Sequence, residues 1–327
     1  MRYLRPLMQV GPARPAGAVQ TGWCWFTHVE VLRRDGPPEI VDVDTLTDHE
    51  RACFTKTGDA PALMGILNVT PDSFSDGGQH DDITSAVEHA RRLTCEGAAI
   101  IDIGGESTRP GAQTVAPAEE IARTSPVIEA IRDAGITTPI SIDTRKAAVA
   151  QAALDAGATI INDVSGLTFD AALAPLCARR KVPLVVMHAQ GDPTTMQNDP
   201  QYENVLLDVY DWLSARIDAL VAQGIAREDI TIDPGIGFGK TLHHNLALLQ
   251  RLSLFHGLGV PILLGASRKR FIGTIGNAPQ AADRAPGSVG VALAAASQGI
   301  QLIRAHDIAD HAQAIALWRA AVAHPPT

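Results

Sequence analysis

From residue 60 onward, short apolar runs alternate with longer stretches in which apolar residues recur at helical spacing. A short apolar run bounded by turn residues is typical of a strand buried on both faces of a parallel sheet. The eight runs lie at 62–69, 98–103, 139–142, 159–161, 183–187, 230–232, 261–264 and 300–303. The helical stretches after them lie at 83–96, 117–134, 146–156, 171–180, 204–223, 245–252, 288–297 and 308–322. Eight βα units in ~260 residues predict an α/β fold, a (β/α)8 TIM barrel over residues 60–327, and the count of eight favours this barrel over a doubly wound open sheet.

The chain before residue 60 has a different pattern. Residues 1–20 are rich in Pro, Gly and Ala and predict a mobile tail. Residues 21–59 contain two partly alternating segments on either side of Asp35-Gly36-Pro37, which is typical of a β-hairpin. We expect this N-terminal extension to be structural, with the hairpin covering the closed end of the barrel.

A polar residue ends or closely follows every apolar run. These residues are Asn68, Asp102, Asp143, Asn162, His188, Asp233, Ser267, and Arg304 with His306. One of them alone could cap the helix that follows, as Asp143 could. Because the carboxyl ends of all strands of a parallel barrel meet at one face, the set predicts a site at that face.

Composition excludes several classes of protein. The net charge of −9 and the pI near 5.6 argue against a nucleic-acid partner, although local cations could still bind a small anion. No apolar run reaches the ~18 residues of a membrane span, so we expect no membrane partner. The four cysteines form no CxxC pair, and this indicates reduced thiols in a cytoplasmic protein.

The loop at 233–241, Asp-Pro-Gly-Ile-Gly-Phe-Gly-Lys-Thr, resembles a phosphate-binding loop but fails its pattern, because Pro234 stands where the first glycine is required. No serine or cysteine nucleophile with a neighbouring base is evident. The residues that remain are the carboxylates Asp143 and Asp233 and the amide Asn162. Carboxylates pair with an amidine-like donor edge, as in a 2-amino-pyrimidinone ring, and an amide matches a mixed edge.

Cations come from the last two predicted strands. Lys269, Arg304 and His306 suit a phosphate or diphosphate, with Arg109 and Arg268 nearby. Asn68 offers an oxygen to Mg²⁺, which commonly bridges protein and phosphate oxygens. The sequence therefore predicts a site for a flat polar heterocycle joined to a diphosphate, with Mg²⁺ as cofactor.

From about residue 60 to its end the chain resembles the dihydropteroate synthases of the bacterial folate pathway. The resemblance is carried by long motifs at Met64–Gly78, Asp102–Gly111, Ser141–Thr144, Ile161–Val164, Met187–His188 with Thr195–Gln197, Asp233–Lys240, Gly265–Lys269 and Ile303–Asp307. It implies condensation of 6-hydroxymethyl-7,8-dihydropterin diphosphate with 4-aminobenzoate to 7,8-dihydropteroate and diphosphate, by a cytoplasmic homodimer whose arylamine site also binds sulfonamides.

The resemblance also implies a role for each site residue. Four residues, Asp143, Lys269, Arg304 and His306, would be catalytic, and Asn68 would bind Mg²⁺. The pterin would lie against Asp143, Asn162, Asp233 and Lys269. The diphosphate would meet Thr108, Arg304 and His306. The aminobenzoate would be surrounded by Ser73, Phe74, Arg109, Pro110, Phe238 and Lys269.

One position departs from the family pattern: Arg270 follows Lys269 where many members have serine. Its backbone N–H can still bind a carboxylate at a helix N-terminus. Two alternative functions are a pterin-dependent methyltransferase and a non-catalytic pterin-binding paralogue. The first needs neither the diphosphate cations nor the loop at 68–78. The second predicts degraded loops after the first two strands, whereas both of these loops are intact in this sequence.

Overall fold

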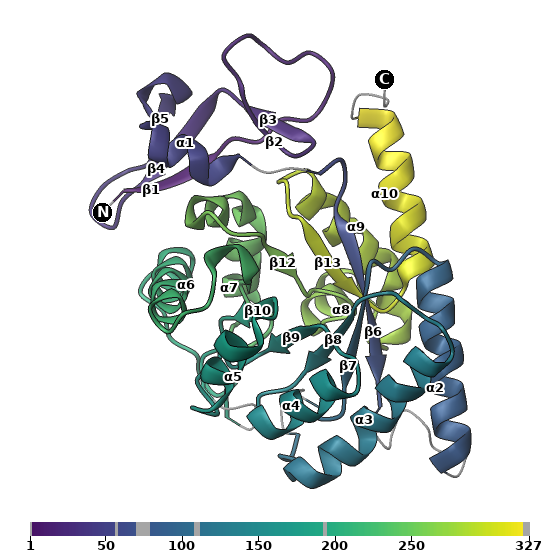
Figure 1. Ribbon diagram of the computed structural model, residues 1–327. Coiled ribbons are helices and arrows are strands. Elements are labelled where there is room, and N and C mark those ends of the chain that lie inside the picture. The colour runs from purple at the N-terminus through teal and green to yellow at the C-terminus, as the bar shows by residue number, and fades with distance from the viewer. Residues whose placement is uncertain (1, 56–57, 70–78, 108–111, 192–194, 323–327) are drawn as a thin grey trace.

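In the computed structural model, a parallel eight-stranded sheet forms the barrel (Figure 1). The structure describes residues 2–55, 58–69, 79–107, 112–191 and 195–322. Neighbouring strands follow the order β11-β10-β9-β8-β7-β6-β13-β12, and a parallel bridge between Ile232 and Ile262 joins the two ends of this order. The strands are β6 (Ala62–Asn68), β7 (Ile100–Gly104), β8 (Ile140–Asp143), β9 (Ile160–Asp163), β10 (Leu184–Met187), β11 (Ile230–Asp233), β12 (Leu263–Leu264) and β13 (Leu302–Ala305). The predicted barrel is confirmed.

Helices connect the strands and cover the outside of the barrel (Figure 1). They are α2 (Gln79–Cys95), α3 (Pro117–Asp133), α4 (Ala147–Asp155), α5 (Leu173–Arg180), α6 (Val205–Ala222), α7 (Leu242–Gln250), α8 (Arg270–Ile275), α9 (Ala285–Ala296) and α10 (Ile308–Val322). The short helix α8 was not predicted, because six residues give too few turns for a helical period to be evident. None of the helices in the described part of the chain combines the length and hydrophobicity of a membrane span.

The inside of the barrel changes from apolar to polar along the strands. Met64, Val185, Leu263 and Leu302 form a separate buried cluster near the strand beginnings. Because side chains alternate along a strand, the residue two positions after Leu302 points to the same interior, and that residue is Arg304. The polar residues at the strand ends therefore lie on top of a packed apolar layer, which fixes them at one face.

The N-terminal extension forms a small β-rich unit with its own core. Strands β1 (Tyr3–Pro6), β4 (His28–Leu32) and β5 (Glu39–Asp42) form one antiparallel sheet, and β2 (Val19–Thr21) pairs with β3 (Cys24–Phe26). The predicted hairpin is therefore β4–β5. Helix α1 (Asp48–Phe54) completes the unit with a capping box at Thr47.

The prediction of a mobile tail over residues 1–20 is wrong. Residues 3–6 pair with β4, and the Tyr3 side chain is only 2% exposed. The Pro- and Gly-rich composition describes the loop between β1 and β2, but the apolar residues before it supply a strand that the extension's core requires. Tertiary burial therefore overrides the local composition.

The extension packs against segments that lead into the last two barrel strands. Ser253 Oγ donates to the Pro6 carbonyl at 3.0 Å, and Trp23 Nε1 donates to the Ala296 carbonyl at 2.8 Å. Ser253 belongs to the 3-10 helix η4 (Leu252–Leu258), which precedes β12, and Ala296 ends α9, which precedes β13. The extension therefore covers the end where the barrel strands begin, opposite the polar face (Figure 1).

Candidate active site

Two buried carboxylates share one guanidinium at the polar face. Arg304 Nε donates to Asp102 Oδ2 at 2.6 Å, and Nη2 donates to Asp143 Oδ2 at 2.9 Å. Burial raises the pKa of Asp143 to about 7; Arg304 opposes this shift, and the charge of Asp102 adds to it. For Arg304, burial lowers the pKa, but the two carboxylates outweigh burial and raise it. The guanidinium is thus permanently charged, while Asp143 is close to its protonation midpoint at neutral pH.

Asn162 belongs to the same group. Its Nδ2 donates to Asp102 Oδ2 at 3.1 Å, so its carbonyl oxygen remains available as an acceptor. Among the described residues, Oδ1 of Asp102 and Oδ1 of Asp143 are buried and have no hydrogen-bond partner. Buried polar atoms are nearly always satisfied, so these atoms match a polar ligand that supplies donors.

Asp233 lies beneath the loop that follows β11. Its Oδ1 accepts from the Gly235 backbone N–H at 2.7 Å. Burial raises its pKa, and the nearby Lys269 ammonium acts in the opposite direction. A side chain at position 265 would place its Cβ 3.3 Å from Asp233 Oδ2, so Gly265 keeps the approach to this carboxylate open. The acidic and amide residues predicted to hold the pterin are therefore all buried at one face.

Lys269 links the Asp233 region to an aromatic wall. Its Nζ donates to the Ile236 carbonyl and lies 4.5 Å from the centre of the Phe238 ring. Burial lowers its pKa to about 8, against the raising effect of Asp233. This is the position expected of a residue that touches both a ring bound at Asp233 and an arylamine bound at Phe238.

One of the basic residues predicted to lie near the diphosphate is paired elsewhere. Ser267 Oγ and His306 Nδ1 are 3.0 Å apart, which orients the imidazole beside Arg304 on β13. Arg268, expected near the diphosphate, instead pairs with Asp307, with Nε 3.0 Å from Oδ2. Its guanidinium is thus committed to a local ion pair, and Arg304 and His306 are the basic residues that the described part of the chain places at the end of β13.

Asn68 ends β6 beside this group. The Asn68 Oδ1 and Asp143 Oδ2 atoms each lie 3.8 Å from the point where a Cβ on Gly104 would be, so the missing side chain leaves room between them. No group of three or more His, Cys, Asp or Glu side chains in the described ranges could hold a metal. One amide oxygen without an acidic cage fits Mg²⁺ that is held mainly through substrate phosphates.

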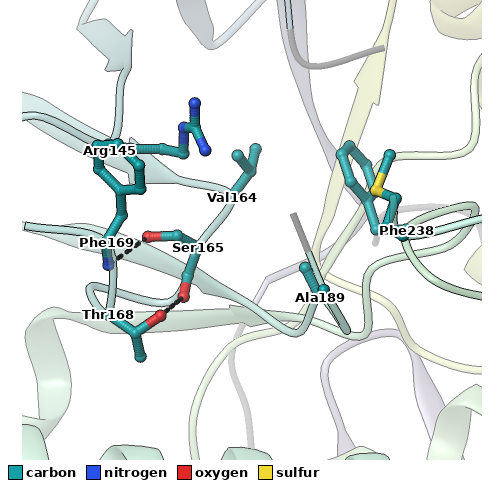
Figure 2. A pocket seen from close by; sticks show the side chains of 9 residues that line it. Arg145, Val164, Ser165, Thr168, Phe169, Ala189 and Phe238 are labelled. Carbon is teal, nitrogen blue, oxygen red and sulfur yellow. Dashed lines mark hydrogen bonds between the residues drawn. The ribbon is translucent and has the colours of Figure 1, made fainter. Parts of the chain in front are cut away.

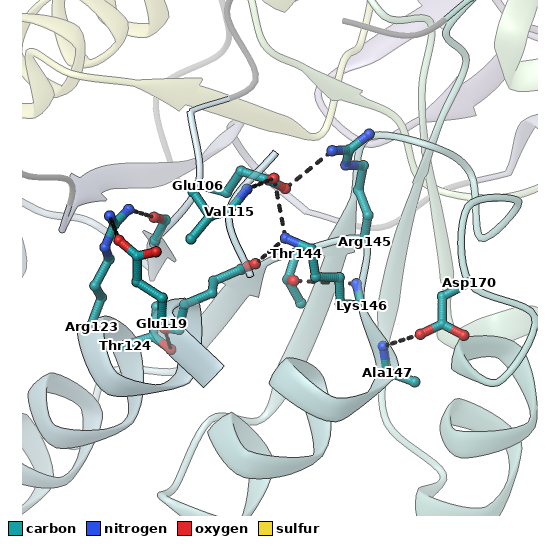
Figure 3. A network of polar contacts seen from close by, with 12 residues as sticks. Glu106, Val115, Glu119, Arg123, Thr124, Thr144, Arg145, Lys146, Ala147 and Asp170 are labelled. Atoms are coloured by element: carbon teal, nitrogen blue, oxygen red, sulfur yellow. Dashed lines mark hydrogen bonds and ion pairs between the residues drawn. The ribbon is translucent and has the colours of Figure 1, made fainter. Parts of the chain in front are cut away.

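Sequence reasoning missed a buried charge network at the ends of β7 and β8 (Figure 3). Glu106 accepts from Arg145 Nη2 at 3.2 Å and lies 3.1 Å from Lys146 Nζ, which also pairs with Glu120. Glu106 Oε1 further accepts from the Val115 backbone N–H at 2.9 Å. The network therefore fixes both ends of the segment that contains residues 108–111. The spacing of these charges along the chain does not indicate this pairing.

A cavity of about 360 Å³ opens beside the site (Figure 2). Phe238 forms one side, and Arg145 lies over the Phe169 ring at 4.2 Å on the other. Five predicted substrate-binding residues fall outside the described ranges: Ser73, Phe74, Thr108, Arg109 and Pro110. Their roles remain predictions.

Comparison with known proteins agrees with this geometry. Residues 64–306 match the family described as pterin binding enzyme. The chain belongs to this family. The matched segment begins in β6 and ends at His306, so it includes the strand-end residues of the site from Asn68 to His306.

Among the family's members, dihydropteroate synthases resemble the chain closely. The Synechocystis enzyme of that name is 44% identical over 287 residues, which cover 86% of this chain and 96% of the relative. The Xanthomonas albilineans dihydropteroate synthase in complex with 7,8-dihydropteroate is 42% identical, with a TM-score of 0.73 over 80% of this chain and 94% of that one. A Yersinia pestis dihydropteroate synthase with a sulfonamide drug complex is 40% identical, with a TM-score of 0.75 over 89% and 98%. The resemblance drawn from the sequence motifs is confirmed.

Proposed function

We propose that this chain is a dihydropteroate synthase that joins 6-hydroxymethyl-7,8-dihydropterin diphosphate to 4-aminobenzoate, forming 7,8-dihydropteroate and diphosphate. The observation that carries the proposal is the buried Asp102–Arg304–Asp143 group with Asn162 and Asp233 around it. A dihydropterin presents N–H donors and a carbonyl on one flat edge, which these carboxylates and the amide complement.

Arg304 and His306 lie where the departing diphosphate would be bound. Negative charge grows on the diphosphate as the bond from the pterin methylene to oxygen breaks, and fixed cations stabilise that charge. Asn68 would hold Mg²⁺ there. When bound, the ion would neutralise part of the diphosphate charge.

The arylamine would approach between Lys269 and Phe238. An aromatic amine is neutral at pH 7, so it can attack the methylene carbon without prior loss of a proton, and the amine proton leaves after the bond forms. This agrees with a site whose residues bind and orient charge rather than form a nucleophile–base pair. Ser73, Phe74, Thr108, Arg109 and Pro110 would complete the arylamine and diphosphate contacts.

A homodimer in the cytoplasm is part of the proposal. All four cysteines are unpaired, as expected for a reducing compartment. The apolar Leu317 on α10 is 66% exposed in the single chain and suits a subunit contact.

The deciding experiment measures dihydropteroate and diphosphate formed from the two substrates with and without Mg²⁺. We expect turnover that needs both substrates and the metal. Asp143→Asn should lose most activity while remaining folded, whereas Asp155→Asn, which removes the exposed partner of Arg180, should behave as wild type. Methyl transfer without diphosphate release would favour the methyltransferase alternative, and pterin binding without turnover would favour the non-catalytic one.

A further inference from the structure

Lys240 is a buried lysine beside the site that the reaction outlined above does not use. It lies between β11 and α7 and is 3% exposed. Its Nζ donates to the Gly235 carbonyl at 2.9 Å and to the Phe238 carbonyl at 3.0 Å, and it is 2.9 Å from Nδ1 of His188. An ammonium has three N–H donors, so these three neutral acceptors satisfy it.

The contact with His188 fixes the state of that ring as well. A charged Lys240 can only donate, so Nδ1 accepts from it, and the imidazole is then neutral with its proton on Nε2. Burial and the adjacent ammonium hold the pKa of His188 well below its ordinary value. Burial also lowers the pKa of Lys240 to about 7, partly offset by the charge of Asp233. Keeping a charged lysine here is costly, which argues against an incidental role.

The two carbonyls bound by Lys240 belong to one tight turn. The Phe238 backbone N–H donates to the Gly235 carbonyl at 3.2 Å. The backbone of this turn lies directly against the end of β10: a Cβ at position 235, where φ is +71°, would be 1.8 Å from the His188 carbonyl oxygen. Lys240 therefore fastens the turn to the neighbouring strand at the point where only glycine fits.

Lys269 contacts the same turn. Its Nζ donates to the Ile236 carbonyl, which lies between the two carbonyls held by Lys240, and its chain packs beside Gly237 and over the Phe238 ring. The turn at 235–238 is thus bound by two lysines, one of which belongs to the proposed substrate site.

We propose that Lys240 is a positioning residue. By holding the Gly235 and Phe238 carbonyls, it fixes the positions of the Phe238 ring and of the Ile236 carbonyl. The Ile236 carbonyl accepts from Lys269 and so orients Lys269 toward the arylamine. This inference rests on the proposed function. Asp233 is held by a different contact, because its Oδ1 accepts from the Gly235 backbone N–H, and neither of these atoms is bonded to Lys240. Loss of Lys240 should therefore disturb the arylamine side more than the pterin side.

The test compares Lys240→Met with Tyr202→Phe in the full-length protein. Tyr202 donates its hydroxyl to the Gly239 carbonyl at 2.8 Å, so its replacement removes one bond to the same loop without touching the Gly235–Phe238 turn. For Lys240→Met we expect the KM for 4-aminobenzoate to rise about tenfold or more, because two or three hydrogen bonds that fix the turn are lost. The Kd for pterin diphosphate should change less than about threefold, and Tyr202→Phe should leave both values near wild type.

A double-mutant cycle with Phe238→Leu separates positioning from general stability. If Lys240 acts through the Phe238 ring, adding Lys240→Met to Phe238→Leu should raise the arylamine KM little further. Additive effects in the cycle, an unchanged KM with only a lower Tm, or equal losses for both substrates would each overturn the proposal.

If Lys240→Met does not fold, His188→Phe replaces it in the same cycle. This change removes one acceptor of the ammonium but keeps both turn carbonyls bonded, so we expect a smaller rise in the arylamine KM that is again absent in the Phe238→Leu background. An unchanged KM in His188→Phe, or an additive effect in the cycle, would overturn the proposal. Wild-type protein that fails to condense the two substrates would instead refute the proposed function, and that result is read before any variant is made.

Discussion

Replacing Asp102 by asparagine tests how the site divides one guanidinium between two carboxylates. Asp102 is fully buried, and its Oδ2 accepts from both Arg304 and Asn162. The substitution keeps the size of the side chain and removes its charge. Asp143 then loses the neighbouring negative charge that helps to raise its pKa, and it becomes the single carboxylate bonded to Arg304.

The expected shift follows from these contacts. An Asp beside an Arg commonly has its pKa lowered by about 1–3 units, and here that effect is divided between two acids. The pKa of Asp143, about 7 in the wild type, should therefore fall by about one unit or more. The charged form of Asp143 is the one that accepts the pterin N–H groups, so binding should persist to lower pH in the variant.

Calorimetric titration with 6-hydroxymethyl-7,8-dihydropterin, which lacks the titrating diphosphate, measures this directly. In the wild type, affinity should decline as the pH falls through about 7, and in Asp102→Asn the midpoint should lie near pH 6 or below. Asp155→Asn provides the surface control. A midpoint that stays at its wild-type pH, or moves upward, would refute the idea that Asp102 and Asp143 compete for Arg304.

The pH dependence of stability gives a second readout of the same variant. The pKa of Asp143 is higher in the folded chain than in the unfolded chain, so the folded state binds the proton more tightly. Its contribution to the free energy of unfolding is present at acid pH and is lost as the pH rises from about 4 to about 7. Asp102→Asn should narrow the pH range of this loss, because stability should stop falling near pH 6 instead of near pH 7. The upper end of this range is the relevant quantity, because the absolute stability also changes when the Arg304–Asp102 bond is removed.

Further outcomes follow from other contacts. Asp143→Asn should make binding of the diphosphate-free pterin weaker and nearly independent of pH around 7, as measured by the same titration. Chelation of divalent metal should abolish turnover, and Asn68→Ala should raise the Mg²⁺ concentration needed to restore it. Lys146→Met leaves two buried carboxylates without their shared cation and should lower the free energy of unfolding by about 3 kcal/mol in urea titration. Deletion of residues 1–59 should lower the Tm, because it uncovers the buried surface of η4 and α9, whereas a site at the opposite end of the barrel should keep its pterin affinity.

The barrel and the strand-end residues were predictable because both depend on local order. A buried parallel strand is apolar throughout, and the residue that follows it must lie at the carboxyl face. The run 62–69 contains β6, which ends at Asn68, and Asp143 and Asp233 end β8 and β11 as expected. Position along the chain therefore determined which side of the fold each residue occupies.

Pairing between distant residues was not predictable in the same way. Asp102 bonds to Arg304, 202 residues away, and Tyr3 to Asp211, 208 residues away, and neither pair leaves a periodic signal. Lys240 was interpreted only as part of a failed phosphate-loop pattern, because its acceptors are backbone carbonyls and a histidine ring that become neighbours only in the folded barrel. Backbone acceptors in particular have no side-chain identity that a sequence could reveal.

Ionisable groups of the site are buried, and their charged forms are poorly stabilised when no substrate is bound. Asp143 has a pKa near 7 and Lys269 has one near 8, in each case because burial disfavours the charge. A pterin that donates hydrogen bonds to Asp143 and Asp233 would restore favourable contacts to the carboxylates, and a diphosphate would do so for Arg304. Electrostatic stabilisation of a departing anion requires charged groups that interact weakly with water and most favourably with the bound and reacting substrates. The proposed mechanism has no nucleophile–base pair, and burial shifts the pKa values of the ionisable groups in the site. Both features have one explanation: the residues bind and stabilise charge, and the substrates supply the reacting atoms.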